Sequence, residues 1–117
     1  MTVKRIVADV ATEDVASVRA FYEDLFDLTP VMDQGWIVTL TSDATTKVQI
    51  SIASEGGSGT PVPDMSIEVD DVDAIYARAQ RMGVEITYDL TDEPWGVRRF
   101  YARDPAGKLL NILSHIG

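Results

Sequence analysis

One order of elements, a strand, a helix and three strands, occurs twice along this chain and constrains its fold more than any other feature. In the first half, Asp14–Leu28 carries apolar residues at the three-and-four spacing of one buried helical face. Runs of apolar and branched residues on both sides of this helix are separated by turn-forming residues. We therefore expect strands at Val3–Val10, Pro30–Met32, Trp36–Leu40 and Lys47–Ala53.

The second half repeats this order. Met65–Val69 predicts a strand, and an apolar stripe over Val72–Met82 predicts a helix, with Gly83 at the position where helices commonly end. Three further strands are expected at Val84–Leu90, Arg98–Arg103 and Leu109–Ile116. The pattern therefore predicts an α+β fold of two βαβββ modules.

A flexible connector is expected between the two modules. Residues 54–63 contain the run Gly-Gly-Ser-Gly and two prolines, a composition typical of linkers. We expect a single domain over residues 1–117, with module one at 1–53, the linker at 54–63 and module two at 64–117.

The last two strands are expected to form a hairpin. Between them, Asp104 can accept hydrogen bonds from its own backbone, Pro105 presets a turn torsion, and Gly107 tolerates a left-handed conformation. The chain is therefore predicted to reverse direction at this point.

Composition excludes several classes of function. The chain of 117 residues contains no cysteine, which rules out disulfides, thiolate metal sites and cysteine nucleophiles. A formal charge of -9 opposes binding to nucleic acid and is explained by solubility or by attraction of a cationic ligand. The sequence has neither a membrane-spanning apolar run nor the apolar core of a signal peptide, so we expect no membrane partner and a cytoplasmic location.

Four short motifs resemble the vicinal oxygen chelate superfamily, also called the glyoxalase, bleomycin resistance and extradiol dioxygenase superfamily. They are Asp14–Tyr22, Glu68–Asp73, Pro94-Trp95-Gly96 and Asp104–Gly107, and the resemblance spans essentially the whole chain. It implies a glyoxalase-like domain in which the modules curl a mixed sheet around a cavity, within one chain or across a homodimer.

Metal-dependent members of that superfamily place a histidine near the start of a module and a glutamate on its last strand. The resemblance puts these second-module positions at Asp64 and Asn111, and the first-module histidine position at Val7. The expected last strand of the first module contains Gln49 but no carboxylate. Because amides are poor ligands of first-row metals, we expect neither metal nor cofactor. His115 has no second histidine to join, and we expect it at the surface.

Strand alternation indicates which side chains face the cavity, because residues two apart share one face of a sheet. Arg99 and Arg103 could bind a ligand carboxylate or pair internally with Glu68 or Asp64, and Tyr101 offers a ring and a hydroxyl. The tryptophans could stack on a ligand or simply pack. The candidate ligand-binding residues are Trp36, Gln49, Ser51, Asp64, Ser66, Glu68, Trp95, Arg99, Tyr101, Arg103 and Asn111.

These features favour a metal-free protein that binds a small molecule, such as a cationic drug or metabolite, and that forms a homodimer. The first alternative is a metal-dependent lyase, isomerase or dioxygenase that acts on a substrate with vicinal oxygens. The second is metal-free acid or base catalysis by Glu68 or Asp64, which would require a buried carboxyl group.

Overall fold

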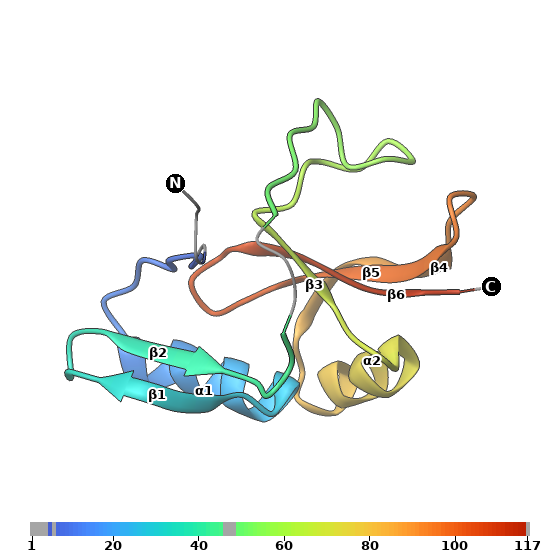
Figure 1. The fold of residues 1–117 in the computed structure, drawn as a ribbon. Helices are drawn as coiled ribbons and strands as arrows, with labels where there is room; N and C mark the ends of the chain where they lie inside the picture. Colours follow the sequence, from blue (N-terminus) through green and yellow to red (C-terminus); the bar gives the residue numbers. More distant parts are fainter. Residues whose placement is uncertain (1–4, 6, 46–48, 117) are drawn as a thin grey trace.

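The computed structural model describes residue 5, residues 7–45 and residues 49–116. Within these residues the chain forms an α+β fold of two helices and six strands (Figure 1). In chain order they are α1 (Val15–Phe26), β1 (Thr29–Asp33), β2 (Val38–Thr41), β3 (Met65–Glu68), α2 (Val72–Arg81), β4 (Glu85–Asp92), β5 (Val97–Arg103) and β6 (Leu109–His115).

The second half forms the complete βαβββ unit that the sequence predicts. Its four strands make one sheet in the order β3-β6-β5-β4, in which β3 runs parallel to β6 and the other neighbours are antiparallel. One row across this sheet brings together Ser66, Asn111, Tyr101 and Tyr88. Because residues opposite one another share a face, these four side chains lie on the same side of the sheet.

An aspartate caps the N-terminus of each helix. Asp14 and Asp71 accept hydrogen bonds from the backbone N–H groups of Ser17 and Ala74, each three residues into the helix. At the other end of α2, Gly83 adopts a positive φ of 70°, as expected of a residue that ends a helix.

Both helices cover the same face of the four-stranded sheet. Val18, Phe21 and Leu25 of α1 pack in one cluster with α2 and with the strands β5 and β6. The strand residues in this cluster include Phe100, Ala102, Leu110 and Ile112, which share one face of the sheet because residues two apart along a strand point the same way. In Figure 1 the helices lie on one side of the sheet and the segment that leads into β3 crosses its other side.

The first half is less complete than predicted. β1 and β2 form a separate two-stranded sheet, and all of β1 is exposed. The expected strands Val3–Val10 and Lys47–Ala53 were wrong within the described residues, because Arg5, residues 7–10 and residues 49–53 belong to no strand. A strand persists only when a neighbour satisfies its backbone groups, and these segments have no such neighbour among the described residues.

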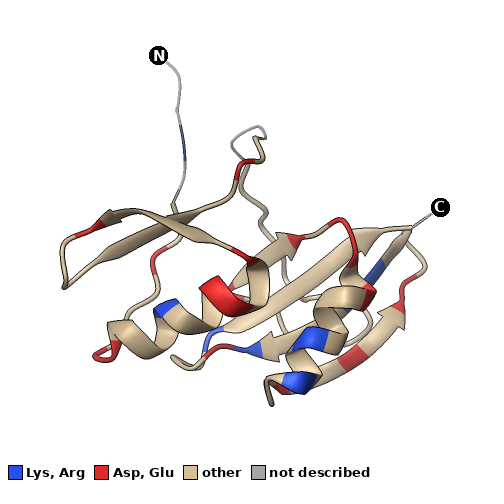
Figure 2. Ribbon diagram, turned by 90° about the horizontal axis from the view of Figure 1, so that it is seen from below, with Lys and Arg blue, Asp and Glu red and all other residues tan. Residues whose placement is uncertain are grey.

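Acidic residues are spread over the helices, the strands and the loops (Figure 2). This distribution favours solubility as the explanation of the net charge of -9. Among the described residues, neither helix has the length and apolar character needed to cross a bilayer.

Candidate functional site

The candidate site lies on the face of the four-stranded sheet that the helices do not cover, which we call the open face. Alternation along β3, β5 and β6 places six of the predicted residues on this face or at its edge. They are Ser66, Glu68, Arg99, Tyr101, Arg103 and Asn111. The structure thus gathers on one surface more than half of the residues selected from the sequence.

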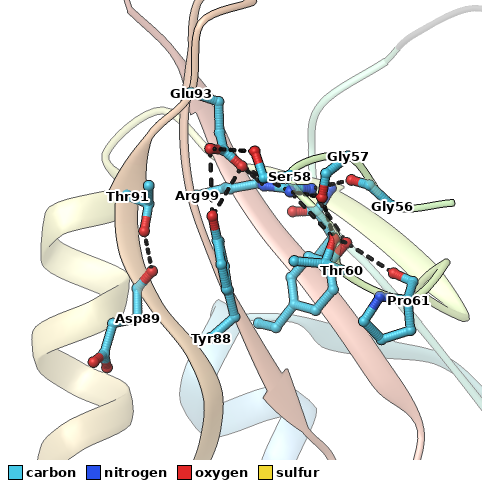
Figure 3. Close-up of polar contacts among 12 residues, drawn as sticks. Gly56, Gly57, Ser58, Thr60, Pro61, Tyr88, Asp89, Thr91, Glu93 and Arg99 are labelled. Atoms are coloured by element: carbon cyan, nitrogen blue, oxygen red, sulfur yellow. Dashed lines mark hydrogen bonds and ion pairs between the residues drawn. The ribbon is translucent and has the colours of Figure 1, made fainter.

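Part of the expected linker is folded against the open face. This segment, residues 56–61, we call the strap (Figure 3). The N–H of Gly56 donates to the carbonyl of Thr60, and the N–H of Thr60 donates to the carbonyl of Gly57, which closes the strap into a compact turn. The strap therefore has a defined conformation, although its composition is that of a flexible linker.

Arg99 anchors the strap to the sheet. Its guanidinium donates to the carbonyl oxygens of Gly56 at 2.7 Å and Gly57 at 3.2 Å. On its other side it pairs with the carboxylate of Glu93 at 2.7 Å, and both side chains are 3% exposed. Arg99 therefore pairs internally, as one of the two sequence hypotheses held, but with Glu93 instead of Glu68 or Asp64.

Three aromatic rings surround this guanidinium. The rings of Tyr88, Trp95 and Tyr101 lie 5.3, 5.1 and 5.0 Å from the Cζ atom of Arg99. At these distances a ring face attracts a cation. Glu93 also accepts from the Tyr88 hydroxyl, so the arginine is held by both charge and aromatic contacts.

Tyr101 is the second attachment point of the strap. It is 1% exposed, and its hydroxyl lies 3.1 Å from the carbonyl oxygen of Pro61 and 3.0 Å from the Thr60 hydroxyl. The buried residues Arg99 and Tyr101 thus present their donors to the oxygens of the strap.

Asn111 lies beside Tyr101 in the next strand. Its amide nitrogen donates to the Ser66 hydroxyl at 3.1 Å, while its carbonyl oxygen is buried and has no hydrogen-bond partner among the described residues. A buried acceptor without a donor is unfavourable, so this oxygen is a candidate contact for a ligand N–H or O–H group.

Of the remaining predicted residues, only Trp95 contacts Arg99 among the described interactions. Asp64 is exposed and accepts from the backbone N–H of Leu109, and Arg103 lies at the rim, 3.6 Å from Glu85. Trp95 is half exposed beside the strap. Gln49, Ser51 and Trp36 are exposed and have no contact with Arg99 among the described interactions.

The carboxyl groups proposed for metal-free catalysis are not buried. The side chain of Glu68 is 63% exposed, and its carboxylate oxygen lies 2.9 Å from Nδ1 of His115, which is at the surface as expected. Asp64 is exposed as well. The burial that acid or base catalysis by these groups would require is therefore not observed.

Sequence reasoning missed Glu93, Tyr88 and Thr60. Glu93 stands directly before Pro94-Trp95-Gly96, the turn of the β4–β5 hairpin, and its backbone N–H donates to the carbonyl of Val97 across that turn. The Pro94-Trp95-Gly96 run between the expected strands Val84–Leu90 and Arg98–Arg103 could have indicated a turn that brings Glu93 close to Arg99, since both residues flank this run.

A separate groove of about 870 Å³ lies in the first half. It runs between α1, the β1–β2 hairpin and the residues that precede α1, and of the predicted site residues it includes only Trp36. This groove is distinct from the open face.

The sequence matches the glyoxalase/bleomycin resistance protein/dioxygenase superfamily over residues 3–112. The chain belongs to this superfamily. The match covers more than half of the chain and agrees with the resemblance and with the βαβββ unit of the second half. No curated protein matches this chain in sequence.

Solved structures of the glyoxalase-like fold are similar to this chain. TioX from Micromonospora sp. ML1 has a TM-score of 0.64 at 21% identity, covering 97% of this chain and 98% of that chain. TnmS3, an antibiotic binding protein from Streptomyces sp. CB03234, has a TM-score of 0.64 at 21% identity, covering 91% and 90%. Lactoylglutathione lyase from Agrobacterium tumefaciens has a TM-score of 0.60 at 20% identity, covering 88% and 87%. At these identities the likeness shows the fold alone.

The donor set does not fit the metal centre of metal-dependent superfamily members. Of the corresponding positions, Val7 offers no donor, Asn111 offers an amide, and Asp64 already accepts from a backbone N–H, while the expected first-half strand over residues 47–53 contains Gln49 but no carboxylate. The described residues contain no group of three or more His, Cys, Asp or Glu side chains that could hold a metal ion.

Proposed function

We propose that this chain is a metal-free binding protein that sequesters a small organic molecule at the open face. Proteins of the superfamily bind small molecules, and the relative TnmS3 is an antibiotic binding protein. The observation that carries the proposal is the pair of residues at the second-half metal positions. An amide at Asn111 and a carboxylate at Asp64 that is committed to the backbone favour hydrogen bonding to a ligand over metal chemistry.

The ligand that we propose is a drug or metabolite with an aromatic part, and a cationic group is compatible with the net charge of -9. Trp95 offers a half-exposed ring, while the buried oxygen of Asn111, which has no partner among the described residues, offers an acceptor. These groups would fix the orientation of a ligand that is held mainly by apolar and aromatic contact.

A thermal-shift screen of small molecules and divalent ions tests this function. A ligand that binds only the folded protein raises its unfolding midpoint, by an amount that grows with ligand concentration. We expect shifts with organic compounds and none with zinc, nickel, iron or manganese. Stoichiometric metal in protein purified without chelator would instead support the alternative, a metal-dependent lyase, isomerase or dioxygenase.

We also propose that the chain acts as a homodimer in the cytoplasm, as one domain with the module boundaries given above. Ile50 and Ile52 are 79% and 95% exposed, and a second copy could cover such apolar side chains. Light scattering is expected to give the mass of a dimer. The variant Ile50→Asp/Ile52→Asp should be a monomer, whereas Met82→Asp, a matched change of an exposed apolar residue elsewhere, should leave the dimer intact. A parent protein that is already monomeric would contradict the dimer.

A further inference from the structure

The strap accepts hydrogen bonds from the same donors that a ligand bound to the open face would need. Arg99 and Tyr101 are buried hydrogen-bond donors of this face, and each is directed at a carbonyl oxygen of the strap, as Figure 3 shows for Arg99 and Gly56. Gly56 and Pro61 supply these two oxygens. A free ligand could reach the same donors only after these carbonyl groups had left.

The strap is shaped to fit this position closely. Gly57 has a φ of 85°, and a Cβ atom added there would lie 2.6 Å from the indole ring of Trp95. A Cβ atom at Gly56 would collide with the Tyr101 hydroxyl. Only glycine at both positions allows the backbone to approach the aromatic residues in this way.

The strap is held mainly by polar contacts. Ser58 and Gly59 are exposed, so their release uncovers little apolar surface. The contacts that would be lost are hydrogen bonds, of which those to the charged groups of Arg99 and Glu93 are the strongest. None of them joins two strands, so a ligand that replaces these hydrogen bonds can displace the strap without unfolding the sheet.

The charge of the site indicates which groups could replace the strap. Glu93 already neutralises Arg99, and both are buried. A ligand carboxylate would add an uncompensated negative charge to this pair, and a cation placed against the guanidinium would be repelled, so a cationic group of the ligand would have to lie away from Arg99. The groups of the strap that Arg99 and Tyr101 now bind are neutral amide carbonyls.

We propose that the strap is an internal, displaceable ligand of Arg99 and Tyr101, and that the molecule that replaces it is flat and carries neutral carbonyl oxygens, as in an amide, ester or lactone. The carbonyl oxygens accept from Arg99 and Tyr101, and the flat part stacks on the ring of Trp95 that Gly57 now covers. This inference rests on the proposed function and adds to it the chemical class of the ligand and the step that controls its entry.

Benzamide, benzoate and benzamidinium are suitable probes, because they share one shape and differ in charge. We would titrate each into ¹⁵N-labelled protein and follow the indole signal of Trp95, with the exposed Trp36 as an internal control. The variant Gly57→Ala should loosen the strap by collision with Trp95. Gly35→Ala is its matched control, because Gly35 has the same φ of 85° but an added Cβ atom would meet nothing within 4 Å.

Thr60→Val provides a second way to loosen the strap, since it removes the hydroxyl that contacts Tyr101 and the carbonyl of Gly57. Faster hydrogen exchange at the backbone N–H of residue 60 would show that the strap has opened, while circular dichroism monitors the fold. Because closure by the strap reduces apparent affinity by the fraction of open protein, we expect both variants to bind benzamide at least about fivefold more tightly than the parent and Gly35→Ala.

Benzoate and benzamidinium should bind more weakly than benzamide in every protein. Equal benzamide affinity in loosened and parent proteins, or no benzamide binding to an opened strap, would overturn the strap inference. A preference for either charged probe would overturn the ligand class. These results differ from failure of the proposed function itself, which would appear as a thermal-shift screen of the parent without any organic ligand.

Discussion

The hydroxyl of Tyr22 donates a 2.6 Å hydrogen bond to the carboxylate of Asp104, a residue 82 positions away in the sequence. The other oxygen of Asp104 accepts from the backbone N–H groups of Ala106 and Lys108 and so shapes the β5–β6 turn. The bond therefore fastens α1 of the first half to the hairpin of the second half. Two of the motifs that indicated the superfamily meet at this bond.

Loss of this bond is expected to destabilise the fold. In Tyr22→Phe the carboxylate of Asp104, which is 4% exposed, loses a donor while it stays buried. We expect the free energy of unfolding to fall by about 1 to 3 kcal/mol in urea titrations. Tyr76→Phe is the control, because its bond to Asp89 is 3.4 Å long and exposed, and the expected change is under about 0.5 kcal/mol. Equal losses in the two variants would contradict this role of Asp104.

The same tyrosine makes the stability depend on alkaline pH. Burial, together with the Asp104 carboxylate, raises the pKa of Tyr22 above its ordinary value of 10.0. Above this pH the unfolded chain releases the proton that the folded protein retains, so ionisation favours unfolding. The stability contributed by Tyr22 is present below pH 10 and decreases as the pH rises further.

We therefore expect unfolding free energy to fall more steeply above pH 10 in the parent protein than in Tyr22→Phe. The difference in slope should be at most about 1.4 kcal/mol per pH unit for this single proton. Urea titrations of both proteins on either side of pH 10 measure it, and subtraction removes the contribution of the other tyrosines. Parallel curves would show that Tyr22 ionises as readily in the folded state as in the unfolded chain.

The second half of the fold could be predicted from the sequence because its signals are local. Alternation in β5 and β6 and the turn at Asp104 specify a hairpin, and the observed strand ends differ from the predicted ones by one or two residues. The expected strands at Val3–Val10 and Lys47–Ala53 depend on partners that lie far away in the chain. Local propensity therefore predicted strands in these two segments. The described residues of both segments, including the exposed Ile50 and Ile52, belong to no strand.

The buried pair of Arg99 and Glu93 should be far more sensitive to substitution than a surface pair on the same strand. Arg99→Met leaves the carboxylate of Glu93 buried without its partner, and we expect a loss of about 3 to 5 kcal/mol. Arg98→Met removes ion pairs with Asp92 and Asp73, in which the side chains are 34% to 58% exposed, and we expect a loss of about 1 kcal/mol or less.

A double substitution separates the cost of the unpaired Glu93 carboxylate from the other effects of losing Arg99. Adding Glu93→Gln to Arg99→Met removes the unpaired charge, so part of the lost stability should return. Urea titrations of the four proteins complete the cycle. A loss in Arg99→Met no larger than in Arg98→Met would mean that water reaches Glu93 when Arg99 is absent.

The hydrogen-bond partners of the site residues could not be predicted from the sequence. The sequence placed Arg99 and Tyr101 on the open face through alternation, and the structure agrees. The sequence could not indicate that the carbonyl groups of Gly56 and Pro61 would accept hydrogen bonds from Arg99 and Tyr101. A glycine-rich segment has no side-chain pattern that specifies a partner. Tertiary contacts order this segment, because the carbonyl groups of the strap are buried against two hydrogen-bond donors. Its composition alone is that of a flexible linker.

The assignment of metal positions can be tested by restoring the missing ligands. Asp64 directly precedes β3 and accepts from the backbone N–H of Leu109, while Asn111 lies in the neighbouring strand β6, two residues after Leu109. Side chains in such a diagonal arrangement are about 7 to 8 Å apart at their origins, within reach of two long ligands to one ion. Asp64→His combined with Asn111→Glu should therefore create affinity for nickel or zinc.

Calorimetric titration with nickel chloride measures this gain, and the two single variants are the controls. We expect the double variant to bind at least about tenfold more tightly than either single variant, because two ligands on a rigid sheet act together. The unfolding midpoint of the double variant should also rise with nickel concentration, while that of the parent stays constant. If the double variant binds no better than the single variants, Asp64 and Asn111 do not occupy the superfamily's metal positions, and the main support for a metal-free site is lost.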